Sequence, residues 1–143
     1  MARILVIDDD RAVSSSLGAM LEYEEFDVVI ADDGRSGVAA AQSAAFDLII
    51  IDIFMPGMDG LDTIRAIRVR DAVVPIIAIS GFTTRAGSLG EAGVLARAVE
   101  LGATLALEKP FRRREIIGAV KSCMETSQRA SRDKWEKTDA VLL

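Results

Sequence analysis

The chain of 143 residues contains no histidine and only one cysteine, Cys123. Without histidine there can be no Ser-His-Asp or Cys-His catalytic arrangement, no histidine metal ligand and no phosphohistidine on the chain itself. A single cysteine excludes an internal disulfide, which fits a reducing compartment. Any phosphoryl transfer by this chain must therefore use a carboxylate.

Aromatic residues are also scarce, at 5% of the chain, so the core is expected to consist mainly of Ile, Val, Leu and Ala. The short apolar run at residues 4–7 meets Asp8 at once and is therefore neither a signal peptide nor a membrane span. The net charge of −5 disfavours direct binding to nucleic acid or anionic lipid, although it would also serve solubility alone. These features predict one cytoplasmic domain.

Strand-like and helix-like segments alternate along the chain. Short apolar runs predict strands at 4–7, 26–31, 46–51, 73–79 and 103–107. Helical spacing or high alanine content predicts helices at 11–24, 35–45, from 61, at about 95–101 and from about 113, with Asp10 capping the first. This alternation predicts right-handed crossovers and a five-stranded parallel sheet with helices on both faces, a doubly wound α/β fold.

The last segment differs from the rest, so we expect a domain at 1–123 followed by an extension at 124–143. From residue 125 onwards the segment holds four basic and four acidic residues, and its strong apolar anchors are Trp135 and 141–143. It is either a tail or a continuation of the fifth helix that contacts a partner or a second copy.

Polar side chains follow four of the five predicted strands. Asp8 and Asp9 follow the first strand, Asp52 the third, Ser80 the fourth and Lys109 the fifth. Because the carboxyl ends of parallel strands lie on one edge of a sheet, we expect these residues to meet at one site.

Three carboxylates held together repel one another unless a hard cation lies between them. Mg²⁺ prefers oxygen ligands and takes few of them from protein. We expect Asp9 and Asp52 to be direct ligands, the backbone carbonyl of Phe54 to be a third, and Asp8 to act through water.

Asp52 can then attack a phosphorus atom, because carboxylates form acyl phosphates. The cation and Lys109 would stabilise charge on the transferring group, and the Ser80 hydroxyl would donate to a phosphate oxygen. Taken singly, each residue also has a plainer role: helix capping for residues 8–10, a turn for Asp52 or Ser80, and a solvated loop for Lys109.

The chain resembles bacterial response-regulator receiver domains of the single-domain type. The motifs that match are Ile4–Asp10, Asp52–Gly60, Ile79–Gly81 and Lys109–Phe111, and the resemblance covers about residues 2 to 123. It implies a flavodoxin-like sheet of order 2-1-3-4-5 and a histidine kinase or histidine phosphotransfer protein as phosphoryl donor. It also implies Asp52 as acceptor, Asp8 and Asp9 at a Mg²⁺ site, and Ser80 with Lys109 as the pair that senses phosphate.

Two departures from the family lie away from the acceptor site, on the side where such domains contact their output partners. Ala106 stands where the family often has Tyr or Phe as a switch residue, and Ser80 and Lys109 are separated by 29 positions, several more than usual. The extra length predicts a long mobile loop or an altered fourth helix within 81–93. At the acceptor, Phe54 and Phe82 should hinder an attacking water, which predicts a phosphorylated form that lasts hours, or else they only cover the sheet edge.

Three functions remain open at this point. The first is a phosphoacceptor whose own catalysis is limited to slow self-dephosphorylation. It is either a stand-alone domain or a piece of a longer regulator, and it could signal by forming a homodimer. The second is a pseudo-receiver that binds partners without phosphorylation, favoured by Ala106. The third is a phosphohydrolase of the haloacid dehalogenase type, for which Asp8 and Asp10 have the right spacing but Ala12 does not fit.

Overall fold

The computed structural model describes residues 1–81 and 90–126. Five strands and four helices alternate in the order β1 (Arg3–Ile7), α1 (Arg11–Tyr23), β2 (Asp27–Ala31), α2 (Gly34–Ser43), β3 (Leu48–Asp52), α3 (Gly60–Arg70), β4 (Ile76–Ser80), α4 (Gly90–Glu100) and β5 (Leu105–Glu108). A fifth helix covers residues 113–126, at the end of the described chain. The predicted alternation is therefore confirmed.

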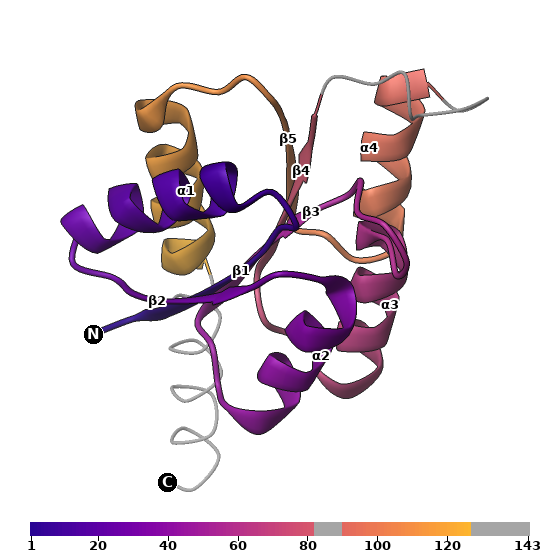
Figure 1. Cartoon of the computed structure of the whole chain (residues 1–143), viewed down its shortest axis with the longest axis horizontal. Helices are drawn as coiled ribbons and strands as arrows, with labels where there is room; N and C mark the ends of the chain where they lie inside the picture. The colour runs from indigo at the N-terminus through magenta and orange to yellow at the C-terminus, as the bar shows by residue number, and fades with distance from the viewer. Residues whose placement is uncertain (82–89, 127–143) are drawn as a thin grey trace, which may run out of the picture.

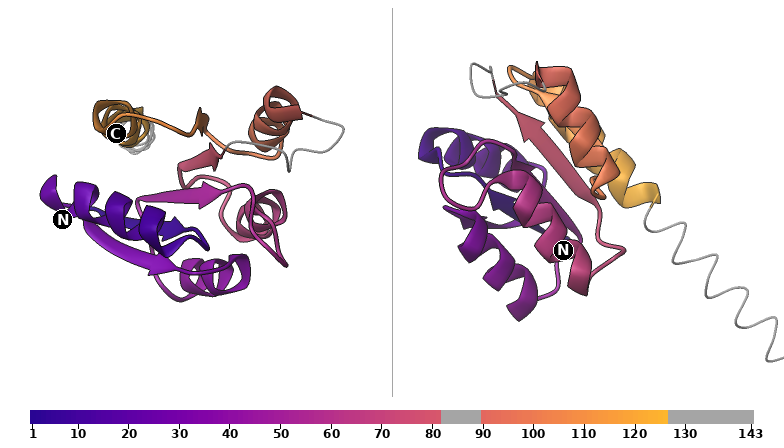
Figure 2. Two further views of the ribbon diagram at one scale, coloured as in Figure 1. Left: turned by 45° about the horizontal axis from the view of Figure 1, so that its top comes forward. Right: turned by 90° about the vertical axis from the view of Figure 1, so that its right-hand side faces the viewer.

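The five strands form one parallel sheet in the order β2-β1-β3-β4-β5, as the resemblance implied. Helix α1 and the helix at 113–126 cover one face, and α2, α3 and α4 cover the other (Figures 1 and 2). The step from β1 to β2 runs across the sheet in the opposite direction to the later steps, so crossovers of one hand place α1 on one face and α2, α3 and α4 on the other. The fold is the doubly wound α/β class that the sequence predicted.

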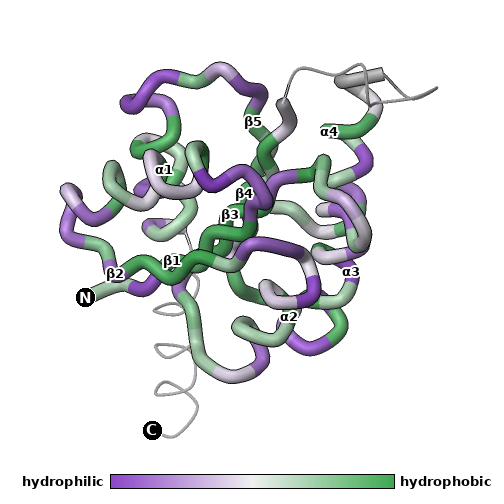
Figure 3. The backbone as a smooth tube through the Cα atoms, viewed as in Figure 1, coloured by the Kyte–Doolittle hydropathy of each residue, from purple (hydrophilic) through white to green (hydrophobic). Residues whose placement is uncertain are grey.

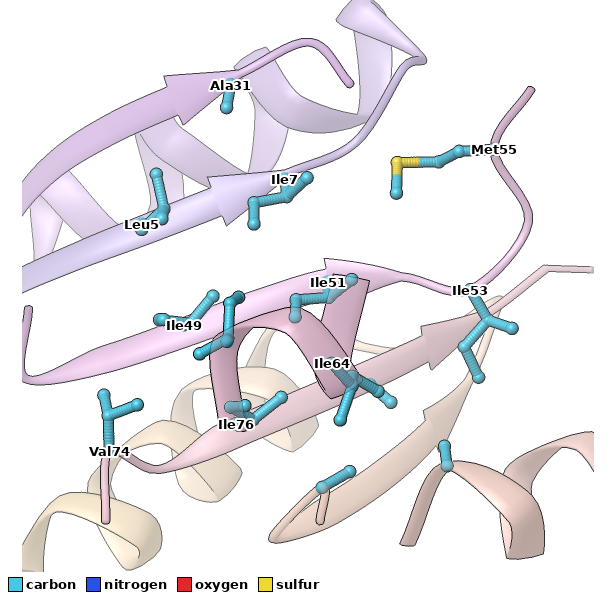
Figure 4. Close-up of a cluster of buried hydrophobic side chains, with 14 of the residues drawn as sticks. Leu5, Ile7, Ala31, Ile49, Ile51, Ile53, Met55, Ile64, Val74 and Ile76 are labelled. Carbon is cyan, nitrogen blue, oxygen red and sulfur yellow. The ribbon is translucent and has the colours of Figure 1, made fainter. Parts of the chain in front are cut away.

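Buried side chains form one cluster on each face of the sheet. The cluster under α2, α3 and α4 draws on alternate residues of β1, β3 and β4, such as Ile7 and Ile51, together with Ile64 of α3 (Figure 4). The cluster under α1 and the helix at 113–126 takes the intervening residues, such as Val6 and Ile50. Strands buried on both faces are therefore hydrophobic along their length, which is visible in Figure 3.

Aspartates begin three of the helices. The side chain of Asp10 accepts hydrogen bonds from the N–H groups of Ala12 and Val13, as predicted. Asp33 and Asp59 cap α2 and α3 in the same way. Because Asp33 caps this helix, α2 begins at Gly34, one residue before the predicted start at residue 35.

The predicted start of the fourth strand at residue 73 is wrong, because β4 begins at Ile76. The carboxylate of Asp71 accepts hydrogen bonds from the N–H groups of Val73 and Val74, at 2.9 Å each. These bonds hold the two valines in a turn, although both have high strand propensity.

Arg68 ties α3 to the turn that precedes β5. Its Nε and Nη2 atoms donate to the carbonyl oxygen of Gly102 at 3.0 and 2.8 Å, and its Nη1 donates to the carbonyl of Asp71 at 3.1 Å. Gly102 has φ of +120°, a conformation that favours glycine. Arg68 thus attaches the end of α4 to α3. The helical spacing of the sequence places Arg68 on α3 but does not predict this contact.

Several expectations concern residues outside the described ranges. Phe82 and most of the segment 81–93 belong to these, although α4 begins at Gly90 and so includes the end of that segment. Residues 124–126 of the extension belong to the fifth helix, and Trp135 and residues 141–143 lie outside the described ranges. In the described part of the chain, no helix has the length and apolar character needed to cross a membrane.

Candidate functional site

The polar residues singled out in the sequence follow the strands at one edge of the sheet. Asp52 is the last residue of β3 and Ser80 the last residue of β4, while Asp8 directly follows β1. Since β1 and β4 both pair with β3, these three side chains come from adjacent strands. Lys109 follows β5, and its backbone N–H donates to the carbonyl of Ser80 at 2.7 Å.

Three carboxylates converge at this edge. Oxygen atoms of Asp8, Asp9 and Asp52 all lie within 4.8 Å of one another. Asp8 and Asp52 are buried, with 1% and 6% exposure, whereas Asp9 is exposed. The site therefore has a buried floor of two carboxylates and a third carboxylate at its rim.

Lys109 is the cation that faces these carboxylates. Its Nζ lies 3.4 Å from Oδ2 of Asp8 and 4.0 Å from Oδ2 of Asp52. One lysine beside three carboxylates leaves the described cluster with an excess of negative charge. The structure thus brings together four of the predicted site residues, from positions as far apart as 8 and 109.

Backbone groups hold the two buried carboxylates in place. The N–H of Asp10 donates to Oδ1 of Asp8 at 2.9 Å, and the N–H of Phe54 donates to Oδ1 of Asp52 at 3.3 Å. Each acceptor lies two residues before its donor, an arrangement that aspartate favours where a strand turns into a loop. In both carboxylates the other oxygen, Oδ2, faces Nζ of Lys109.

The electrostatics of the cluster are most unfavourable at Asp52. Burial raises the pKa of Asp52 to about 7, and the negative charge of Asp8 is the second cause of the rise. The Lys109 ammonium and the Phe54 N–H offset part of it. A buried carboxylate with a raised pKa is stabilised in its charged form when a cation approaches.

The donor set fits Mg²⁺. It consists of carboxylate oxygens of three aspartates, without nitrogen or sulfur, and one of the three lies at the surface. Mg²⁺ selects oxygen ligands and keeps several water ligands, which an exposed rim allows. A divalent cation would also relieve the excess negative charge that raises the pKa of Asp52.

Ser80 ends β4, the strand beside that of Asp52, and Ala106 lies on β5, two residues before the register partner of Ser80. Ser80 is fully buried, and its hydroxyl donates to the carbonyl of Gly81 at 3.3 Å. Ala106 pairs with Ala78 of β4 and is half-buried. The β5 position at which the family often has an aromatic ring thus carries only a methyl group.

A groove beside the site was not foreseen from the sequence. It has a volume of about 420 Å³, and its walls are one face of α1 and the segment after β5, namely Ala12, Val13, Ser16, Leu17, Met20, Lys109, Pro110 and Phe111. The spacing of the α1 residues marks a helix face, but only the path of the segment after β5 turns that face into a groove. Lys109 belongs both to this groove and to the carboxylate cluster.

Comparison with known proteins agrees with this geometry. Residues 4–121 match the family described as the response regulator receiver domain. The transcriptional regulatory protein CpxR of Escherichia coli K12 is 34% identical over 150 aligned positions, which cover all of this chain and 61% of CpxR. This chain therefore spans about three fifths of the length of that curated relative.

Two solved structures show the same fold. NtrX from Brucella abortus superimposes with a TM-score of 0.84 at 28% identity, over 94% of this chain and 30% of NtrX. The chemotaxis protein CheY4 of Vibrio cholerae gives a TM-score of 0.76 at 29% identity, over 86% of this chain and 98% of CheY4. The matched fold is thus a part of NtrX and almost the whole of CheY4.

Proposed function

Because the chain belongs to the family of response regulator receiver domains, we propose that Asp52 accepts a phosphoryl group from a histidine kinase or a histidine phosphotransfer protein. The observation that carries the proposal is the cluster of Asp8, Asp9 and Asp52 beside Lys109 at the ends of the parallel strands. The chain would act as a switch in the cytoplasm and not as a turnover enzyme.

In the transfer step, a carboxylate oxygen of Asp52 forms a bond to phosphorus while the bond from phosphorus to the donor's imidazole nitrogen breaks. The imidazole leaves with the electron pair and takes up a proton, and Asp52 becomes an acyl phosphate. The ammonium of Lys109, which lies 4.0 Å from Oδ2 of Asp52, would stabilise charge on the transferring group.

Asp9, Asp52 and the backbone carbonyl of Phe54 would hold Mg²⁺, and Asp8 would act through a water molecule. When bound, the ion supplies positive charge for the phosphoryl oxygens. The N–H bond to Asp8 and its contact with Lys109 orient Asp8 without a metal, which supports an indirect role for this residue. The exposed Asp9 is suited to direct coordination from the rim.

The groove between α1 and the segment after β5 supports docking of the donor protein. It is mostly apolar, it includes Lys109, and it therefore leads from a binding surface to the acceptor cluster. An amphipathic helix that carries the phosphohistidine would fit such a groove. This contact would bring two protein surfaces together before the chemical step.

Phosphorylation would then shift the population between two conformers. The phosphoryl group would draw Ser80 and Lys109 towards it, and the conformer in which these residues have moved would become more populated. The face of α4, β5 and the helix at 113–126 would carry the change to a partner or a second copy. Ala106 has no ring to move inwards, so the response must come from the backbone and α4.

The output partner is a further proposal. CpxR is named a transcriptional regulatory protein, but this chain spans only 61% of it. With its net charge of −5, this chain is poorly suited to direct DNA binding. We therefore favour a protein as the direct output partner of this domain.

The direct test is the intact mass of the protein after incubation with Mg²⁺ and acetyl phosphate, for the wild type and Asp52→Ala. We expect a gain of one phosphoryl group in the wild type alone. The pseudo-receiver, which Ala106 favours, predicts no gain in either protein. Labelling of both proteins would show that the acceptor is another residue.

A further inference from the structure

The loop between β3 and α3, residues 53–59, carries the Phe54 carbonyl that we assign to the metal site. Its end is held by Gly60, the first residue of α3, whose N–H donates to the carbonyl of Ile53 at 2.8 Å. A Cβ atom at Gly60 would lie 2.4 Å from the carbonyl oxygen of Asp52 and from Cα of Ile53. The start of α3 therefore packs directly on the backbone of the acceptor.

A second contact holds the same loop from a distant part of the sequence. Gly34, the buried first residue of α2, faces Met58 of the loop and Thr63 of α3. A Cβ atom at Gly34 would lie 2.7 Å from the carbonyl oxygen of Met58 and 2.5 Å from Oγ1 of Thr63. Such separations are shorter than real Cβ contacts, so a side chain would have to displace one of these groups.

The two displaced groups differ in how easily they move. Met58 contributes backbone of the loop itself, which moves only if the loop moves. Thr63 is fully buried, and its hydroxyl donates to the carbonyl of Asp59 at 2.7 Å, so a shift of its side chain also disturbs the loop end. The φ angle of Gly34 lies outside the left-handed region, so glycine is required at this position for space alone.

We propose that Gly34 is a positioning residue for the Mg²⁺ site, because it lets α2 approach closely enough to fix the loop that presents Phe54 beside Asp52. This inference rests on the proposed function. Gly34 belongs to none of the motifs that carry the family resemblance, and it acts through Met58 without touching the ion. Groups that orient metal ligands change metal affinity even though they do not bind the metal.

The test compares the Mg²⁺ dissociation constants of the wild type, Gly34→Ala and Gly118→Ala by isothermal titration calorimetry. Gly118 is the matched control, because it lies exposed on a helix and a Cβ atom there meets nothing within 4 Å. We expect about tenfold weaker Mg²⁺ binding in Gly34→Ala and no change in Gly118→Ala. Equal dissociation constants in all three proteins would overturn the inference.

A simple loss of folded protein has a different signature. It would lower the number of Mg²⁺ sites per chain and leave the dissociation constant unchanged, whereas a displaced loop raises the constant at full occupancy. In labelling with acetyl phosphate, Gly34→Ala should need about tenfold more Mg²⁺ for half its maximal rate and should recover at saturation. A rate that stays low at every Mg²⁺ concentration would overturn the positioning role.

If Gly34→Ala does not fold, the double variant Gly34→Ala/Thr63→Ala removes the shorter of the two collisions and keeps the one with the Met58 carbonyl. We expect it to bind Mg²⁺ more weakly than Thr63→Ala alone, and equal binding would overturn the inference. A wild type that binds no Mg²⁺ would overturn the metal site itself, which distinguishes that failure from a failure of Gly34.

Discussion

Strands β3 and β5 both pair with β4, yet they differ in how firmly they are enclosed. All five residues of β3 are buried, whereas β5 has none buried and ends in an exposed glutamate. Strand β3 carries Asp52, the proposed acceptor, and β5 leads to the proposed output face through Ala106. On the proposed function, the chemistry would therefore take place at the enclosed centre of the sheet and the response on its partly covered side.

The largest expected effect tests this difference in enclosure. Ile50 of β3 and Leu107 of β5 contribute to the same apolar cluster, but only Ile50 is fully buried. We expect Ile50→Ala to lower the free energy of unfolding by about 3 kcal/mol and Leu107→Ala by about 1 kcal/mol, because the second site leaves a smaller cavity. Urea unfolding measures both values. Equal losses would show that β5 is as firmly packed as β3.

The next prediction concerns the stability that the folded chain loses when the buried Asp52 ionises. Its pKa of about 7 lies above the unfolded value of 3.8, so the folded chain holds the extra proton and loses stability as pH rises from about 4 to 7. Without Mg²⁺ at pH 7.5, Asp52→Asn should be more stable than the wild type by roughly 2 kcal/mol. The advantage should shrink at pH 4.5 and on addition of Mg²⁺. An advantage independent of pH would argue against ionisation as its cause.

A third prediction concerns water at the acceptor. Phe54 is half-buried and follows Asp52 by two residues, so its ring should hinder hydrolysis of the acyl phosphate. Phe54→Ser should shorten the lifetime of the phosphorylated form about tenfold, equivalent to about 1.4 kcal/mol. Phe46→Ser is the control, because Phe46 lies before β3 at the opposite end of the strand. The decay of the phosphorylated mass with time measures the effect, and equal decay in both variants would remove Phe54 from this role.

The smallest effect is expected on the output side. Because β5 is only partly covered, a ring at residue 106 can turn outwards. Ala106→Tyr should therefore change the free energy of unfolding by less than about 1 kcal/mol and leave the labelling rate within about twofold. A large loss of stability would show that this side of the sheet is packed as tightly as the centre, and a changed rate would couple it to the acceptor.

The fold and most of the site were predictable because local signals agree with the tertiary structure. Short strand-like runs that lead to Asp8, Asp52 or Lys109 indicate both a strand and the edge at which the candidate site lies. The sheet order followed only from the family resemblance. For each strand and its terminal polar residue, the residues that allow the prediction are neighbours in the sequence.

The remainder depends on contacts between distant residues. The late start of β4 comes from the side chain of Asp71, and the attachment of α4 comes from Arg68 reaching Gly102. The pKa of Asp52 depends first on its burial and then on its distances to Asp8 and Lys109, which no periodicity encodes. The groove beside α1 exists only because the chain after β5 passes along that helix.

The ion pair between Lys109 and Asp8 joins two residues separated by 101 positions. A growing chain on the ribosome therefore makes both buried carboxylates long before it makes the lysine that faces them. Until that lysine emerges, the β1–β3 half of the sheet holds its acidic residues without their protein counter-charge. On the proposed function, we therefore expect the chain to accept phosphate only after β5 has joined the edge of the sheet and has brought Lys109 to Asp8 and Asp52.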